Sequence, residues 1–224
     1  MRKIAGMVAL AGFCIWASPA AASDITFEGV GKVGIVTVSL TGSPIVGAPT
    51  MVDAGEILWG GAGSSSFYAY CVDLNHYVEN VQAVTPQSTS AMSGNGYVPN
   101  AGNSAAWLLN TYASTIHSSG TGTDAAALQV AIWASIYNLV PSLSGKFTLS
   151  NPGSAIGMEA ASYLNALASH SSSSSATWLS ASNGQSQITG GDVSPTPEPG
   201  AVVLAGTGLL GLLWFRRRTT AIAV

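Results

Sequence analysis

The chain reads FYAYCVDLNH from Phe67 to His76. Its aromatic and β-branched residues favour a β-strand, and the stretch contains Cys71. The one other cysteine in the sequence, Cys14, lies in an N-terminal segment with the features of an export signal. The mature chain therefore carries one cysteine into an oxidising compartment, where it can form no internal disulfide. Cys71 is either a small buried residue or a reactive group whose partner is not a cysteine.

Residues 1–22 have the order of a secretory signal. A positive start at Arg2 and Lys3 precedes the apolar run Ile4–Trp16, and three alanines at 20–22 provide a small-residue cleavage site. The apolar run is too short for a comfortable membrane span. We expect cleavage before Ser23.

The C-terminal end has three successive parts. Residues 193–200 are a proline-rich linker, residues 201–218 are an apolar helix that ends in arginines, and residues 219–224 are a short tail. This pattern predicts one membrane crossing with the arginines in the cytoplasm. The short motif in the linker and the basic cluster after the apolar run consist of Pro197, Glu198, Pro199, Arg216, Arg217 and Arg218.

This tail resembles the PEP-CTERM sorting signal in the order and spacing of its motif, glycine-containing apolar helix and basic cluster. The resemblance implies an exosortase as processing partner in a Gram-negative bacterium. It also implies transient anchoring in the inner membrane, removal of the tail near the motif, and release to the cell surface or extracellular matrix. It covers about the last thirty residues and implies nothing about the preceding domain.

Residues 23–192 fit one extracellular domain by size. The basic residues in this span are Lys32 and Lys146, whereas all ten acidic residues lie between Asp24 and Glu198. Nucleic acid is excluded as a partner because no basic patch is present to neutralise phosphates.

The order of patterns in this domain predicts an α+β fold, with β-sandwich or barrel-like strands, a helical insertion and a closing strand pair. The predicted strands are 25–40, which is either one strand or a hairpin, 50–59, 67–72, 177–179 and 185–188, the last two around an Asn183–Gly184 turn. The predicted helices are 104–112, capped by Asn103 or Ser104, 125–139, capped by Thr123–Asp124, and 154–168.

One polar residue interrupts the apolar face of the second predicted helix. Gln129 shares helical spacing with Ile132, Trp133, Ile136 and Tyr137. An amide buried there without partners costs about 1–3 kcal/mol. Gln129 is therefore hydrogen-bonded in the core, placed at the helix edge, or consumed by a reaction.

Three blocks between Phe67 and Tyr137 resemble the thioester domains of bacterial surface adhesins. They are YCVD at 70–73, AWLLNTY at 106–112 and LQVAIW at 128–133. In that family, an aromatic-Cys-aliphatic motif pairs with a downstream Gln-x-Ala-Ile-Trp motif. The family usually has Thr before the glutamine, where this chain has Leu128.

The resemblance implies an internal thioester between the Cys71 sulfur and the Gln129 side-chain carbonyl. A target amine, most plausibly from a lysine, would attack that carbonyl and become covalently attached. The chain would then be an adhesin-like covalent binder that acts once per molecule, and neither an enzyme nor a cofactor protein. The candidate residues that shield the bond from water are Phe67, Tyr68, Tyr70, Trp133 and Tyr137.

Two alternatives stay open. One is a non-covalent matrix or biofilm protein of the same fold without the bond, which Leu128 favours. The other is a cysteine hydrolase or acyltransferase with His76 or His117 as base. His76 is either a proton-transfer group or a solvated loop residue, whereas we expect His117 and His170 to be solvated. The spacing of Asp73, His76 and Glu79 does not define a metal site.

Overall fold

The computed structural model describes residues 22–61, 66–170 and 174–190. The predicted signal segment, apart from residue 22, lies outside these residues, as do the linker, the apolar helix and the tail. The described part of the chain is an α+β fold with a seven-stranded antiparallel sheet and three α-helices, which confirms the predicted fold class.

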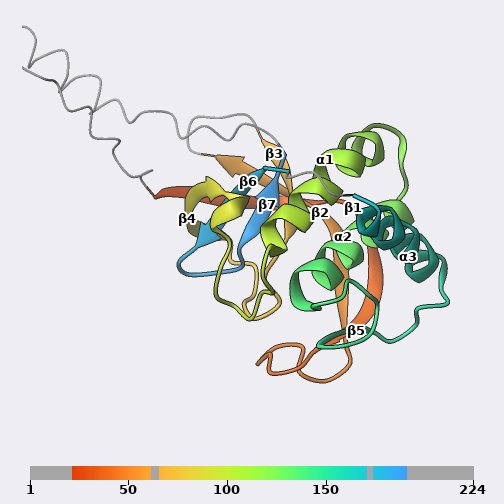
Figure 1. The fold of residues 1–224 in the computed structure, drawn as a ribbon. Helices are drawn as coiled ribbons and strands as arrows, with labels where there is room; N and C mark the ends of the chain where they lie inside the picture. Colours follow the sequence, from red (N-terminus) through yellow and green to blue (C-terminus); the bar gives the residue numbers. More distant parts are fainter. Residues whose placement is uncertain (1–21, 62–65, 171–173, 191–224) are drawn as a thin grey trace, which may run out of the picture.

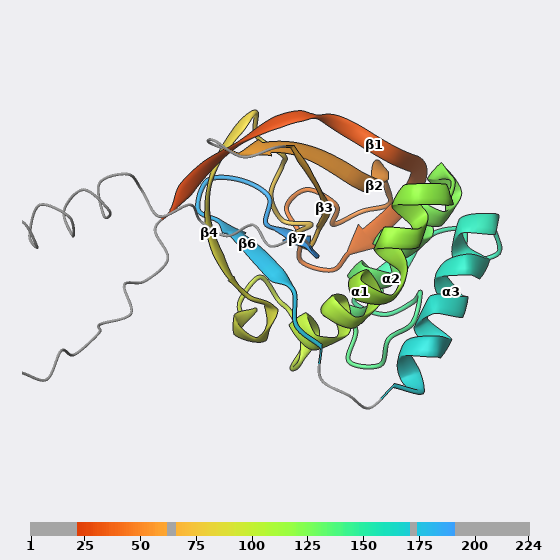
Figure 2. The same cartoon turned by 90° about the horizontal axis from the view of Figure 1, so that it is seen from above.

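Six of the described strands close into a barrel. Their order is β2-β3-β7-β6-β4-β1, and β1 also pairs with β2, so the ring has no open edge there. Figure 2 shows this ring. Strand β5, labelled in Figure 1, lies outside it and pairs with the end of β1 at residues 38–40. The strand bounds are β1 Ser23–Leu40, β2 Thr50–Gly61, β3 Phe67–Cys71, β4 Val81–Ser88, β5 Phe147–Leu149, β6 Thr177–Ala181 and β7 Gln187–Thr189.

The helices gather on one side of the barrel (Figures 1 and 2). They are α1 Ala101–Ser119, α2 Gly122–Tyr137 and α3 Ala155–Ala168, and a single 3-10 turn spans Thr89–Ala91. Every residue of α2 from Ala125 to Tyr137 is buried. A helix that is enclosed on all sides belongs to the core of the molecule, so the single apolar face predicted for it was too narrow. The fold thus holds Gln129 inside the core.

Two helices start earlier than predicted because their start signals lie earlier in the chain, and α1 also continues to Ser119, beyond the predicted end at residue 112. Helix α1 begins after Asn100, which adopts the left-handed conformation at φ 62°, and not after Asn103 or Ser104. Helix α2 begins after Thr121. The Thr121 hydroxyl accepts from the Asp124 N–H, and the Asp124 carboxylate accepts from the Thr121 N–H, which forms a capping box. The third helix, predicted at 154–168, spans Ala155–Ala168, with Ser154 as its N-cap.

A bulge interrupts the pairing of β1 with β2. The register of this pairing shifts between Val30 and Val33. The opposite residue on β2 is Gly55, whose φ of 138° is unfavourable for any residue with a side chain. This bulge shapes one wall of the cleft described below.

Candidate functional site

Cys71 and Gln129 lie against each other in the core. Cys71 is the last residue of β3, and Gln129 lies in the second turn of α2. The Cys71 N–H donates to Gln129 Oε1 at 2.9 Å, and Gln129 Nε2 donates to the Cys71 carbonyl at 2.7 Å. Both residues are almost fully buried. Of the three states that the sequence allowed for Gln129, the structure has the one hydrogen-bonded in the core.

The Cys71 thiol is enclosed by Asp73 and Trp133. Its sulfur is 3.3 Å from both the N–H and the carbonyl oxygen of Asp73. Burial raises the pKa of the Cys71 thiol well above its usual range, and contacts with the Asp73 backbone and the Trp133 side chain lower that pKa only in part. The buried Trp133 indole N–H forms no conventional hydrogen bond within the described residues. The protonated thiol is therefore the favoured form here.

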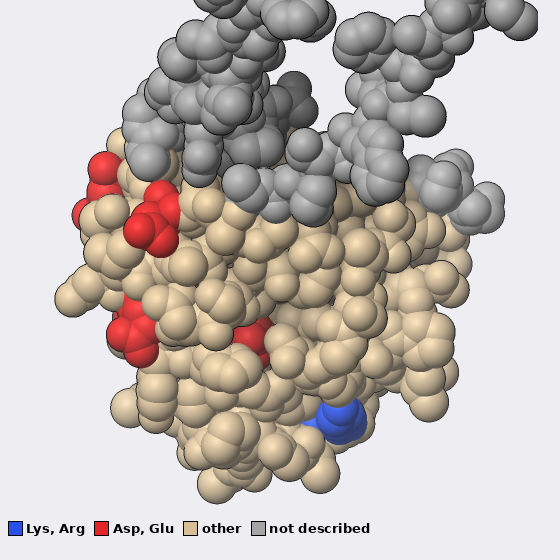
Figure 3. Space-filling model, turned by 90° about the vertical axis from the view of Figure 1, so that its left-hand side faces the viewer, with Lys and Arg blue, Asp and Glu red and all other residues tan. Residues whose placement is uncertain are grey.

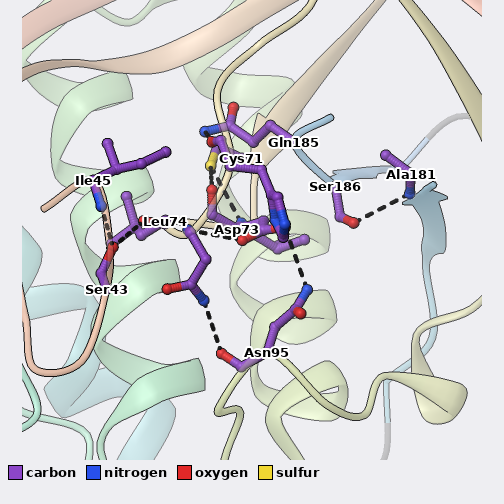
Figure 4. Close-up of polar contacts among 12 residues, drawn as sticks. Ser43, Ile45, Cys71, Asp73, Leu74, Asn95, Ala181, Gln185 and Ser186 are labelled. Atoms are coloured by element: carbon purple, nitrogen blue, oxygen red, sulfur yellow. Dashed lines mark hydrogen bonds and ion pairs between the residues drawn. The ribbon is translucent and has the colours of Figure 1, made fainter. Parts of the chain in front are cut away.

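The turn after Cys71 is fixed from both sides. The Tyr137 hydroxyl donates to the Val72 carbonyl at 3.2 Å and accepts from the Leu74 N–H at 3.1 Å. On the other side, the Ser43 hydroxyl donates to the Leu74 carbonyl at 2.7 Å (Figure 4). Residues from α2 and from the β1–β2 connection thus hold the turn that carries the thiol.

Asp73 connects this turn to a histidine. Its carboxylate is almost fully buried and lies 2.7 Å from His76 Nδ1. It also accepts from the Asn75 N–H at 2.9 Å and from Asn95 Nδ2 at 3.3 Å. Figure 4 shows Asn95 reaching toward Asp73 from below. His76 is half-exposed and paired with a buried carboxylate, which differs from a freely solvated loop histidine.

A cleft of about 400 Å³ opens onto the thiol and the amide. Its walls come mainly from the ribbon of β1 and β2 and from the loop after β3. Polar groups contribute at Asp53, His76 and Gln185, but most of the surface is aliphatic or aromatic. The apolar lining consists of Phe27, Val30, Val33, Ile45, Val46, Val52, Ile57, Leu74, Tyr77, Val78 and Trp133.

The predicted shielding residues divide between two sides of β3. Trp133 lines the cleft and Tyr137 fixes the adjoining turn, so both lie at the thiol. Side chains alternate along a strand, and Tyr68 and Tyr70 therefore point away from Cys71 into a second cleft. Phe67 is partly buried against the core at the far end of β3. The structure does not bring Tyr68, Tyr70 or Phe67 into the lining of the Cys71 cleft.

The second cleft, of about 340 Å³, contains an acid that the sequence analysis missed. Glu56 is buried, accepts from the Lys32 N–H at 3.1 Å and lies 3.2 Å from His117 Nδ1. The His117 ring packs at a tilt against the Tyr68 ring, with the two ring centroids 4.3 Å apart. His117 is therefore a paired residue and not a solvated one, contrary to our expectation. It lines a different cleft from Cys71, whereas His76 shares the Cys71 cleft.

Among the described residues, the remaining candidates from the sequence do not form a further reactive or metal-binding site. The His170 ring packs at a tilt against Trp107, with ring centroids 4.7 Å apart, and its buried Nε2 has no hydrogen-bond partner within the described residues. It is therefore not the solvated side chain that we expected. In the described ranges, no group of three or more His, Cys, Asp or Glu residues is placed to hold a metal ion.

Charges on the described surface are sparse. Figure 3 shows a face with separate acidic groups and one basic region. Both lysines of the domain are held by main-chain oxygens. Lys32 Nζ donates to the carbonyls of Ile116 and His117 at 2.7 and 2.6 Å, and Lys146 Nζ donates to Gly96 at 2.7 Å. Few amines of this domain are thus free to react.

Comparison with known families gives one match, at the C-terminal end. Residues 195–218 match the PEP-CTERM protein-sorting motif, as the sequence pattern predicted. Comparison with the curated proteins and with the solved structures gives no significant match. Among the described residues, no helix is long and apolar enough to cross a membrane, and the predicted membrane helix lies outside them.

The matched motif defines the class of protein. This is an exported protein that an exosortase processes, and its destination is the cell surface of a Gram-negative bacterium. The match covers residues 195–218 and does not extend into the domain that precedes them.

Proposed function

We propose that the domain forms a thioester between Cys71 Sγ and Gln129 Cδ and then captures a target amine covalently. The observation that carries the proposal is the paired hydrogen bonding of the Gln129 amide to the Cys71 backbone, beside the Cys71 thiol and at the base of a cleft. Such proximity replaces an encounter between two groups with a reaction inside one folded chain.

Bond formation needs stabilisation of an oxyanion and departure of ammonia. The sulfur attacks Gln129 Cδ, and the charge develops on Oε1, which already accepts the Cys71 N–H. The C–N bond then breaks, and Nε2 leaves as ammonia with the thiol proton. The product has one C–S bond in place of the C–N bond and the S–H bond. The apolar cleft walls limit access of water to this bond.

In the capture step the sulfur of Cys71 is the leaving group, whereas it was the attacking group when the thioester formed. A primary amine attacks the thioester carbonyl, the C–S bond breaks, and an amide forms between the target and Gln129 Cδ while Cys71 regains its proton. The cleft gives a slender amine a route to the carbonyl. Self-capture is disfavoured because both domain lysines donate to main-chain carbonyls. Each molecule reacts once, so the chain is a covalent binder and not a turnover enzyme.

A matched pair of masses tests the proposal without knowledge of the processed ends. The parent and a Cys71→Ala chain are purified from the same host, and their intact masses are compared. A thioester makes the parent lighter by one ammonia than the substitution alone predicts. Methylamine then adds one molecule to the parent, at Gln129, and exposes one thiol. A parent with the plain mass and a free thiol from the start would exclude the bond.

One observation favours a non-covalent protein of the same fold. Both polar ends of the Gln129 side chain are satisfied by Cys71, so the pair is also a complete structural contact. Leu128, at the position where the resembling family usually has threonine, is fully buried and supplies no polar support. In that case the mass experiment gives the plain sequence mass, and the cleft serves only to bind.

A further inference from the structure

His76 faces the same cleft as the thiol and the amide. Its Nδ1 lies 2.7 Å from Asp73 Oδ2, and the Asp73 side chain is 1% exposed while that of His76 is 54% exposed. A carboxylate at Nδ1 favours the tautomer that carries its proton there, which leaves Nε2 to accept a proton. The buried Asp73 carboxylate thus fixes the orientation of the His76 ring, and the ring remains accessible to solvent.

Asp73 joins this ring to the sulfur. Its N–H and its carbonyl oxygen each lie 3.3 Å from Cys71 Sγ, while its carboxylate holds His76. Asn95 and the Asn75 N–H occupy further acceptor positions of the same carboxylate. Any movement of the Asp73 backbone would change the surroundings of the sulfur and of the imidazole together.

Amine capture needs a group that can accept a proton and return it, for two reasons. Attack makes the amine nitrogen positively charged, and that charge is unfavourable in a cleft with mainly aliphatic walls. The sulfur leaves as a thiolate, which is also unfavourable because burial favours the protonated thiol. One carrier can take the proton from nitrogen and return it to sulfur, so the step consumes no external acid or base.

We propose, on the basis of the function argued above, that His76 is the proton carrier for amine capture and that Asp73 is its positioning residue. The amine nitrogen forms a bond to Gln129 Cδ, His76 Nε2 takes one proton from that nitrogen, the C–S bond breaks, and the proton passes to Cys71 Sγ. The products are an amide and a thiol, with His76 neutral as at the start.

Several titratable groups surround this histidine. Asp73 bonds it directly, and Cys71, Asp53 and Tyr77 line the same cleft. Glu79 lines an adjoining hollow that His76 also borders. A pH profile of capture must therefore be compared between the parent and a chain without the imidazole, because the parent profile alone does not assign the group.

The test measures methylamine incorporation into the full chain by intact mass over a range of pH. The variants are His76→Gln, His76→Asn and Asp73→Asn, with His117→Gln as the matched control. His117 is also half-exposed and bonded through Nδ1 to a buried carboxylate, but it lies in the other cleft. Each chain is first checked for the mass deficit of one ammonia and for a cooperative unfolding transition.

We expect the two His76 variants to hold the thioester and to capture methylamine about 100-fold more slowly than the parent at neutral pH. Their rate should also lose the pH step that the imidazole gives to the parent. Asp73→Asn should slow capture and shift this step, whereas His117→Gln should match the parent in rate and profile.

Other outcomes separate this inference from the function on which it rests. A parent without the mass deficit removes the thioester itself. A parent with the deficit, together with His76 variants that react at the parent rate and with the parent profile, overturns the role of His76 alone. His76 variants that fold but lack the deficit also overturn it, because they place the histidine in bond formation and not in capture. If one His76 variant does not fold, the other and Asp73→Asn still give the rate and profile comparison.

Discussion

The Gln129 side-chain amide forms the two backbone hydrogen bonds with Cys71 that a neighbouring β-strand would otherwise form. Strand β2 pairs with β3 only as far as Ala69, so it does not reach Cys71. On the β7 side, Val72, the residue after Cys71, donates its N–H to the Ser186 carbonyl. The Cys71 N–H and carbonyl face the opposite side, where the Gln129 amide accepts from one and donates to the other. The end of β3 is thus satisfied by a helix side chain, and this contact brings the amide to the thiol.

A glutamate at this position should destabilise the fold. In a Cys71→Ala background, where no thioester forms, Gln129→Glu removes the donor to the Cys71 backbone carbonyl and buries a carboxylate. We expect a loss of about 3 kcal/mol in the free energy of unfolding near pH 7. Burial would raise the pKa of this carboxyl, so the loss should be smaller at pH 5 than at pH 8.

Urea unfolding of the Cys71→Ala and Cys71→Ala/Gln129→Glu chains at both pH values measures this loss. Gln129→Met is the apolar control, since it should destabilise equally at the two pH values. A glutamate chain as stable as its Cys71→Ala parent would contradict the structural role of the amide.

The pH dependence of stability should report whether the thiol is free. Burial raises the pKa of Cys71 in the folded chain, whereas an unfolded thiol titrates near about 8.5. Above about pH 8.5 the unfolded chain therefore binds fewer protons than the folded chain. The free energy of unfolding then falls as pH rises, by up to about 1.4 kcal/mol per pH unit for this one group.

The informative window is between about pH 8.5 and 10, below the range in which unfolded tyrosines titrate. A methylamine-treated chain with an open Cys71 should lose stability in this window, and the Cys71→Ala chain should not lose that contribution. A chain that holds the thioester has no thiol to titrate and should follow the alanine variant. Equal slopes in all three chains would show that burial does not favour the protonated thiol.

Local patterns predicted much of the fold. The alternation in Ile25–Leu40, the Asn183–Gly184 turn and the third helix at 154–168 all correspond to observed elements. Strand β4 was missed because Pro86 lies inside it and proline argues against a strand interior. The closure of the ring by the pairing of β1 with both β2 and β4 depends on contacts distant in sequence. The spacing of apolar residues within one strand or helix does not indicate which distant strands pair.

Some residues of the candidate site could be predicted from the sequence, and others could not. The residues Cys71 and Gln129 were found from composition, helical spacing and motif, and the structure places them in contact. Alternation along β3 would have separated Tyr68 and Tyr70 from Cys71, since they differ from it by odd numbers of positions. The pairing of Glu56 with His117 joins a strand to a helix 61 residues away, and a single acidic residue in a strand gives no sign of it.

The Trp133 indole N–H should assist formation of the bond. It lies one helical turn after Gln129, lowers the pKa of the Cys71 thiol, and forms no conventional hydrogen bond within the described part of the chain. Trp133→Phe keeps an aromatic ring and removes this donor. We expect cross-link formation after refolding to slow by about 100-fold, the scale for loss of one aligned donor.

The fraction of chains with the mass deficit, followed over time after refolding, measures this effect. Trp59→Phe is a matched control, because Trp59 is also buried, its indole N–H has no hydrogen-bond partner among the described residues, and it does not line the Cys71 cleft. Similar rates for the parent and Trp133→Phe would exclude a contribution of the indole.

The apolar cleft should select amines by their aliphatic chain. Attack on the carbonyl requires the amine to pass walls that include Val30, Val52 and Ile57. Each methylene buried there contributes up to about 0.8 kcal/mol. Butylamine has three more methylenes than methylamine, so full burial would give roughly 60-fold faster capture, and we expect butylamine to be captured at least about tenfold faster under equal concentrations of free base. Competition between the two amines, with the products separated by intact mass, measures the ratio directly. Val52→Asp places a charge in the wall and should reduce the preference for butylamine over methylamine. Equal capture of both amines by the parent would mean that the target amine reaches Gln129 without contacting these walls.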